Sequence, residues 1–165
     1  FSECTGLKSA PELPAKVATA DCYTSMFYGC SALTSAPKLP ATKIDRSCYK
    51  RMFEKCTGLT DAPKLPATSL ALFCYSNMFE GCTSLTSAPE LPATELVYAC
   101  YNLMFKDCSK LQYVKALFTT KPSEDTTKEW LSGVASSGTF VKNKNATWKV
   151  TGAHGIPEGW KVETE

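Results

Sequence analysis

The sequence lacks the patterns that most often identify an enzyme or a metal protein. It has one histidine and no C-x-x-C pair, so the ligand spacing of a zinc site is missing. Acidic residues never form the D-x-D cluster that calcium loops need. There is no Gly-rich phosphate loop and no G-x-S-x-G motif. We therefore expect no enzymatic activity, no metal and no other cofactor.

Long hydrophobic runs are also missing, and neither sign of charge dominates. No stretch approaches the roughly 18 apolar residues that cross a bilayer, so we expect no transmembrane segment. With 18 Lys and Arg against 16 Asp and Glu, the chain offers no electrostatic reason to bind nucleic acid. The sequence carries no signal peptide and opens at Phe1, which aligns with Phe27 and Phe53. A start in mid-repeat leads us to expect a fragment whose upstream repeats are missing.

What the sequence does contain is a 26-residue repeat marked by cysteines. The repeat reads C-[TS]-x-L-x-x-A-P-x-L-P-A-[TK] and, after a variable stretch, C-Y-x-x-M-F-x-x. A fixed period of this length is typical of stacked-repeat architectures, in which neighbours bury a face that no repeat could bury alone. Two cysteine series keep the spacing: Cys4, Cys30, Cys56, Cys82 and Cys108, and Cys22, Cys48, Cys74 and Cys100.

The second half of each repeat is predicted to be helical, most clearly at residues 94–107, which contain neither Gly nor Pro. Thr94 is a good N-cap residue, and Glu95 in the first turn opposes the helix dipole. Apolar residues at i, i+4 and i+8 then indicate one apolar helix face. Three repeats share this series: Ile44, Cys48 and Met52; Leu70, Cys74 and Met78; Leu96, Cys100 and Met104.

The first half of each repeat is predicted to hold a very short strand, at about residues 85–88 in the fourth repeat. Pro89 cannot donate to a sheet ladder, so pairing should end there. A 26-residue unit of one short strand and one helix fits a leucine-rich-repeat coil. We therefore predict an α/β leucine-rich-repeat solenoid of about four and a half coils over residues 1–118.

Residues 119–165 break the period and are predicted to form a small α+β cap. A solenoid needs a cap because its last coil otherwise exposes the core to water. Helix-start signals at 123–126 predict a helix that ends at Gly133. Short strands are expected at 140–142, 147–150 and 160–163. A small aromatic core would come from Trp130, Phe140, Trp148 and Trp160.

The order C-x-x-L-x-x-A-P-x-L-P followed by C-Y-x-x-M-F-x-x-C resembles the BspA-like leucine-rich repeats of bacterial surface proteins. The resemblance covers residues 1–118, with Ala-Pro where the family usually has Ile-Pro. It implies display on the bacterial outer surface, or secretion, and a binding role. In surface proteins of this kind, Asp125-Thr126-Thr127 resembles a site of O-glycosylation, which makes Thr126 a candidate for an O-glycan.

Nine cysteines allow three interpretations: disulfides, a metal site or a catalytic thiol. Side chains stacked in one column run parallel instead of converging as a disulfide requires. Metal spacing is absent, and the candidate base, His154, stands alone in the tail. We favour reduced thiols that act as small buried hydrophobes. The prediction applies to Cys30, Cys48, Cys56, Cys74 and Cys82.

Two surfaces vary between repeats and are the candidate binding sites. A polar strip beside the strands carries varied charges and one aromatic ring, and this is the face on which such folds usually bind. A second group lies on the predicted helices and is apolar on a side that should face outward. We expect the C-terminal cap to cover this second group, although an exposed contact patch is the alternative. The strip comprises Lys38, Asp61, Lys64, Glu90 and Tyr113, and the apolar patch comprises Leu72, Phe73, Tyr98 and Leu103.

Two functions fit these features. The first is a non-enzymatic cell-surface module for adhesion, which recognises a protein or glycan on a host or a neighbouring bacterium. The second is a structural spacer of a larger surface or filament assembly, with no ligand of its own. Both need stacked repeats and a polar exterior, so the sequence leaves both open.

Overall fold

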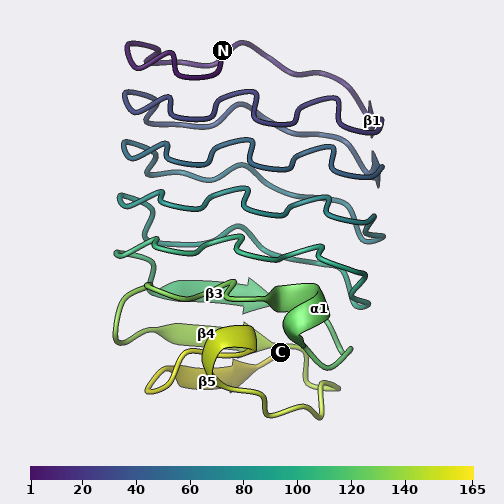
Figure 1. Cartoon of the computed structure of the whole chain (residues 1–165). Coiled ribbons are helices and arrows are strands. Elements are labelled where there is room, and N and C mark those ends of the chain that lie inside the picture. The colour runs from purple at the N-terminus through teal and green to yellow at the C-terminus, as the bar shows by residue number, and fades with distance from the viewer.

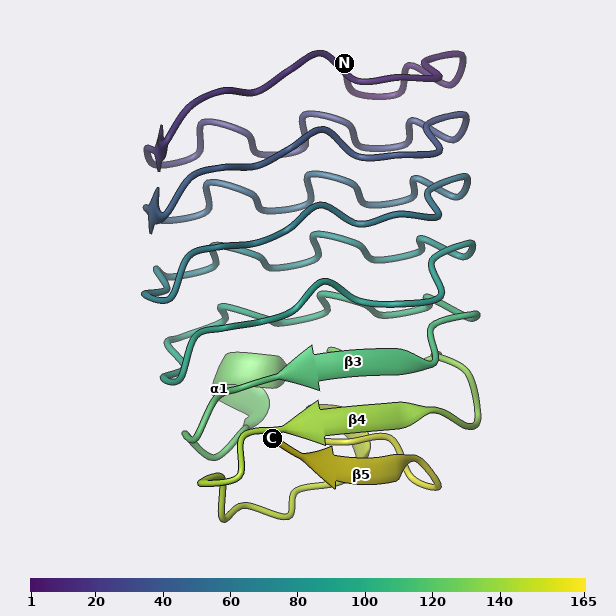
Figure 2. The same cartoon turned by 180° about the vertical axis from the view of Figure 1, so that it is seen from behind.

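The chain forms a stack of layers, one for each repeat (Figure 1). The computed structural model describes residues 1–165. The N-terminus lies at one end of the stack, and the last strands lie at the other. Each layer consists of two backbone runs on opposite faces. A wavy run is in front in Figure 1, and a smoother run is in front in Figure 2.

The helices and strands of the chain are each only two to four residues long. A two-stranded parallel sheet contains β1 (Val17–Ala18) and β2 (Lys43–Ile44). A three-stranded parallel sheet contains, in this order, β3 (Tyr113–Ala116), β4 (Thr139–Lys142) and β5 (Lys161–Thr164). The helical elements are α1 (Glu124–Thr127) and the 3₁₀ helix η1 (Gly152–His154). Neither is long and apolar enough to cross a membrane.

The predicted α/β leucine-rich-repeat solenoid is wrong. The chain is mostly irregular, with 4% helix and 14% strand in two small parallel sheets, and it does not form a closed solenoid. No helix forms at the apolar series of residues 44–52, 70–78 or 96–104. The expected strand at 85–88 is reduced to an isolated bridge between Ser87 and Tyr113.

The predicted helices are replaced by ribbons of consecutive turns. In the second repeat every fourth residue of the predicted helix has a left-handed backbone, with φ of 53° at Ser47, 58° at Arg51 and 61° at Lys55. An α-helix requires right-handed torsions throughout, so these residues exclude it. Amides alternate in direction: Met52 donates within its layer to Tyr49 O (3.2 Å), whereas Tyr49 donates to Cys74 O of the next layer (3.0 Å).

Stacking distance explains why turns form in place of helices. An α-helix with its side chains is about 10 Å wide, whereas paired strands lie about 4.8 Å apart. A ribbon of turns is thin enough to stack at the strand spacing, and it sends every second amide to a neighbouring layer. The two faces of the stack therefore keep one common rise per repeat.

The C-terminal region extends the stack beyond the repeats. Strand β3 pairs with β4 in the 26-residue register, with Tyr113 opposite Thr139, and β5 then pairs with β4 (Figure 2). The strands expected near 140–142 and 160–163 are thus confirmed to within a residue or two, but 147–150 is not a strand. Helix α1 ends at Thr127, not at Gly133, because Lys128 has a non-helical ψ of 121° and Glu129 has a φ of 47°.

Ladders of identical side chains fill the interior. Phenylalanine rings stack from layer to layer, as Phe27 and Phe53 do with centroids 5.6 Å apart. Tyr49 and Tyr75 belong to a parallel tyrosine ladder at 5.8 Å. At the C-terminal end the four expected aromatic residues are buried, and each indole N–H donates to a backbone carbonyl. These four are Trp130, Phe140, Trp148 and Trp160.

The cysteines form part of the same interior. All nine are free thiols, and the five predicted to be buried are buried. Cys4 and Cys22, in the layers nearest the N-terminus, are the exposed ones.

Candidate functional site

The first three A-P-x-L-P segments interrupt the pairing between layers on the smoother face, whereas Leu91 of the fourth pairs with β3. In the second segment, Ala36 donates to Asp61 O (3.4 Å), and the next backbone bond along the chain is Thr42 to Lys16 O (3.3 Å). The residues between, 37–41, make no backbone hydrogen bond. Proline supplies no N–H and fixes its own φ, so two prolines in four residues prevent a continuous ladder.

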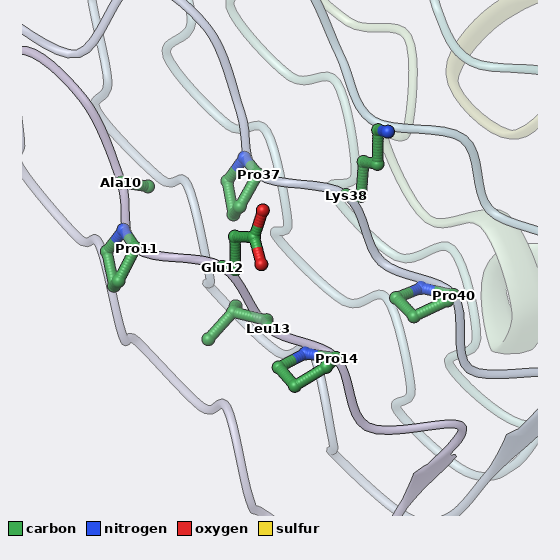
Figure 3. Close-up of a pocket in the computed structure, with 8 residues that line it drawn as sticks. All are labelled: Ala10, Pro11, Glu12, Leu13, Pro14, Pro37, Lys38 and Pro40. Carbon is green, nitrogen blue, oxygen red and sulfur yellow. The ribbon is translucent and has the colours of Figure 1, made fainter.

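Hollows lie where the pairing is interrupted. Their volumes are about 370 Å³ between the first and second segments, 580 Å³ between the second and third, and 420 Å³ between the third and fourth. Figure 3 shows the first of them, with Pro11 and Pro14 facing Pro37 and Pro40. Adjacent hollows share lining residues, so they adjoin along the stack. We call the whole feature the proline groove; it is lined by residues 10–14, 36–40 and 62–66, and by Pro89, Glu90 and Pro92.

One charged residue from each segment lines the groove. Along the stack these are Glu12, Lys38, Lys64 and Glu90. Glu90 pairs with Lys115 at 3.0 Å, and hydrogen bonds to Glu165 and then Glu90 raise the pKa of the Lys115 ammonium. The other three form no ion pair. The middle of the groove is therefore basic and uncompensated.

The structure separates the residues of the predicted strip. Lys38, Lys64 and Glu90 line the proline groove. Asp61 lies in an adjoining hollow of about 220 Å³, where Thr60 Oγ1 donates to its carboxylate at 2.9 Å. Tyr113 lies on β3, outside the groove, and is 38% exposed.

Sequence reasoning missed the walls of the groove. It interpreted the prolines only as residues that end pairing, yet they form most of the lining. The sequence did contain a signal for the groove, because one proline before and one proline after the x-L pair recur in four successive repeats. Residues that cannot pair and that share one register must leave a gap in the same place in each layer.

The apolar patch on the turn face is exposed. Leu72 and Tyr98 are 48% and 54% exposed, whereas Phe73 and Leu103 are partly buried. The ring of Phe73 meets that of Tyr98 edge-on, with centroids 5.3 Å apart. The expectation that the C-terminal region covers this patch is therefore wrong, because that region continues the stack and does not fold back over it.

Thr126, the candidate for O-glycosylation, lies in α1. Its hydroxyl accepts a hydrogen bond from the Ser123 amide at 3.1 Å and forms half of a capping box. A glycan there would compete with the cap that starts the helix.

The buried thiols are poor nucleophiles. Burial raises the pKa of the Cys48 and Cys56 thiols to about 12 and that of the Cys100 thiol to about 11. Reactive cysteines need the opposite shift, because the thiolate is the nucleophile. The side chains present no group of three or more His, Cys, Asp or Glu that could hold a metal ion.

Comparisons with family models, with curated proteins and with solved structures found no match to this chain.

Proposed function

We propose that the chain is a non-enzymatic binding module of a bacterial cell surface, and that the proline groove is its recognition site. The observation that supports this most strongly is a set of adjoining hollows along one face, each lined by the same segment of two successive repeats. Concave, mostly apolar sites with a few placed polar groups are typical of binding sites. In the groove, the placed groups are the four charges of the x position.

The packing around the groove supports a binding role. Leu39 and Leu65, next to the exposed lysines, are buried in the core and fix the segment that carries Lys38 and Lys64. Isolated bridges between Ser35 and its partners Ser9 and Asp61 hold the layers together beside the groove. A site that is ordered before binding loses less conformational entropy on association.

The proposed location on the cell surface is supported by the resemblance of the repeat to BspA-like surface proteins. A partner there would be a protein or a glycan of a host or a neighbouring bacterium. Repeat proteins commonly bind their partners with an extended surface built from successive repeats.

A structural spacer is the alternative function. One observation favours it: the phenylalanine ladder continues without a break from Phe1 to Phe105, with ring centroids 5.5–5.7 Å apart. Such regularity suits a rod whose only task is length.

A binding screen separates the two functions. The purified protein is tested against extracellular-matrix proteins and glycans, beside a Lys38→Glu, Lys64→Glu variant. A Lys110→Glu, Lys149→Glu variant is the control, because it makes the same change of charge at exposed lysines outside the groove. The proposal expects a partner whose binding only the groove variant weakens. A partner lost on Tyr98→Ala and kept by the groove variant would assign binding to the apolar patch, and a screen with no partner would favour the spacer.

A further inference from the structure

The proline groove combines apolar walls with a fixed order of charges, and this combination selects among ligand classes. The walls are proline, alanine and leucine, and the lining includes no aromatic ring and no side-chain amide. A sugar carries many hydroxyl groups, and each one that loses water needs a hydrogen-bond partner. Among the side chains that line the groove, only the four charged ones can supply such partners. A glycan is therefore a poor match.

A polypeptide matches the walls better. Apolar side chains of a ligand would cover the exposed rings of the groove, which are otherwise in contact with water: Pro11, Pro14, Pro40 and Pro66. The amides of Lys38, Leu39, Lys64 and Leu65 donate to no backbone carbonyl of the chain. An extended backbone carries carbonyl groups at regular spacing that can use such donors, as in other modes of extended-peptide recognition.

The charged residues of the groove determine which peptide sequences would match it. Glu12 at one end and the two lysines in the middle form no ion pair, whereas Glu90 at the other end pairs with Lys115, which also pairs with Glu165. From this, and on the basis that the proline groove is the recognition site proposed above, we infer that it binds an extended peptide segment with acidic residues at its centre and a basic residue at the Glu12 end.

The length of the segment follows from the stack. Four proline segments span three layer spacings, which is about 14 Å at about 4.8 Å per layer. An extended peptide advances about 3.3 Å per residue, so about four to five residues cover the groove. Lys38 and Lys64 are one layer apart and can meet one or two neighbouring acidic side chains.

The test uses the whole chain and labelled peptides of about ten residues, long enough to overrun the groove. The first peptide has two central glutamates and a lysine near one end, in an alanine and proline background. In the second, glutamine replaces both glutamates. Affinities are measured by fluorescence anisotropy at low and at raised salt. We expect the glutamate peptide to bind about five- to tenfold more tightly than the glutamine peptide, with the difference shrinking as salt screens the lysines.

Two variants assign that preference to the groove. The Lys38→Glu, Lys64→Glu variant should lose the preference for the glutamate peptide, whereas the Lys110→Glu, Lys149→Glu variant should keep it. Circular dichroism of both variants checks that they are folded. Equal binding of the two peptides, or a preference that the groove variant retains, would overturn the inference.

The result is independent of the screen that tests the proposed function. A groove-dependent partner that proves to be a glycan or a basic protein would support the binding role and overturn the acidic-peptide inference. A screen in which no binding depends on the groove would overturn the role itself.

Discussion

The thiol of Cys56 donates a hydrogen bond to the carbonyl oxygen of Phe27 in the layer before it, at an Sγ–O distance of 3.0 Å. The same carbonyl accepts the amide of Cys30 within its own layer at 3.1 Å. One oxygen therefore closes a turn and also joins two layers. The relationship recurs at 3.0–3.1 Å for Cys30 with Phe1, Cys82 with Phe53 and Cys108 with Phe79.

Replacing Cys56 with alanine should destabilise the fold. The change removes a fully buried sulfur and the bond to Phe27, so we expect a loss of about 1–2 kcal/mol in unfolding free energy. Urea denaturation measures it. Cys4→Ala is the control, because Cys4 is exposed. Equal midpoints for the Cys56 variant and the parent would show that the bond contributes nothing.

Thiol labelling should divide the cysteines into two classes. In the folded protein only the exposed Cys4 and Cys22 should react quickly with an alkylating reagent, since the other seven are buried. In denaturant without reductant, all nine should react, and intact mass counts the added groups. Fewer than nine groups would reveal disulfides and contradict the free-thiol arrangement.

Stability should fall steeply in alkaline solution. Burial raises the pKa of the Cys48 and Cys56 thiols from 9.0 to about 12, and burial also raises that of the Tyr75 phenol. Above pH 9 the unfolded chain loses these protons while the folded chain keeps them. The unfolded state therefore becomes more stable relative to the folded state. Each such thiol can lower the free energy of unfolding by up to about 1.4 kcal/mol per pH unit, in the pH range between its unfolded and folded pKa values.

Urea midpoints at a series of pH values test this loss. They should change little between pH 6 and 8 and drop from about pH 9 upward, where the thiols of the unfolded chain ionise. A midpoint that stays level to about pH 11 would contradict the burial of these groups.

Glycines at left-handed positions should resist substitution. Gly81 has a φ of 72°, and a β-carbon there would meet only ordinary contacts, so Gly81→Ala should cost about 1–2 kcal/mol for the backbone alone. Gly133→Ala should cost more, because its β-carbon would also clash with the Asp107 carboxylate. Gly6→Ala is the control, since nothing lies within 4 Å of its β-carbon position. Thermal denaturation of the three variants should give that order; a Gly81 variant as stable as the Gly6 variant would contradict it.

Circular dichroism tests the turn ribbons directly. With 4% helix, the far-ultraviolet spectrum should lack the double minimum of a helical protein. A strong helical spectrum would mean that segments such as 94–107 are helices after all. Gly81→Ala, which favours helix over a left-handed turn, should not increase the helical signal.

The turn ribbons were missed because their period imitates that of a helix. Cys48, Met52 and Cys56 are four residues apart, and this spacing fits both a helix of 3.6 residues per turn and a ribbon with a four-residue unit. The spacing is strictly four in repeat after repeat, and Gly29 and Gly81 occupy its left-handed position. Both are signals for turns, but choosing between the two structures also needs the distance to the next layer.

The site was predictable in part for a related reason. Lys38, Lys64 and Glu90 were identified as variable and exposed by comparing equivalent positions of the repeats. This comparison requires only that the 26-residue period is known. The groove itself depends on backbone bonds that are absent between residues 26 apart, for example around Pro37 and Pro63. The proline pattern shows that one segment cannot pair as a strand, but it does not give the shape of the hollow between two such segments.

In the second, third and fourth proline segments an exposed residue stands directly before a buried one, as Lys38 stands before Leu39 and Lys64 before Leu65. The exposed residue, which would face a ligand in the proposed site, can thus mutate while its buried neighbour keeps the interior intact. Substitutions can change the charges of this face one repeat at a time. Duplication of a 26-residue repeat adds one further variable position. Related chains could therefore differ in the charges of this face through changes at a few codons, while the buried residues that hold the fold stay the same.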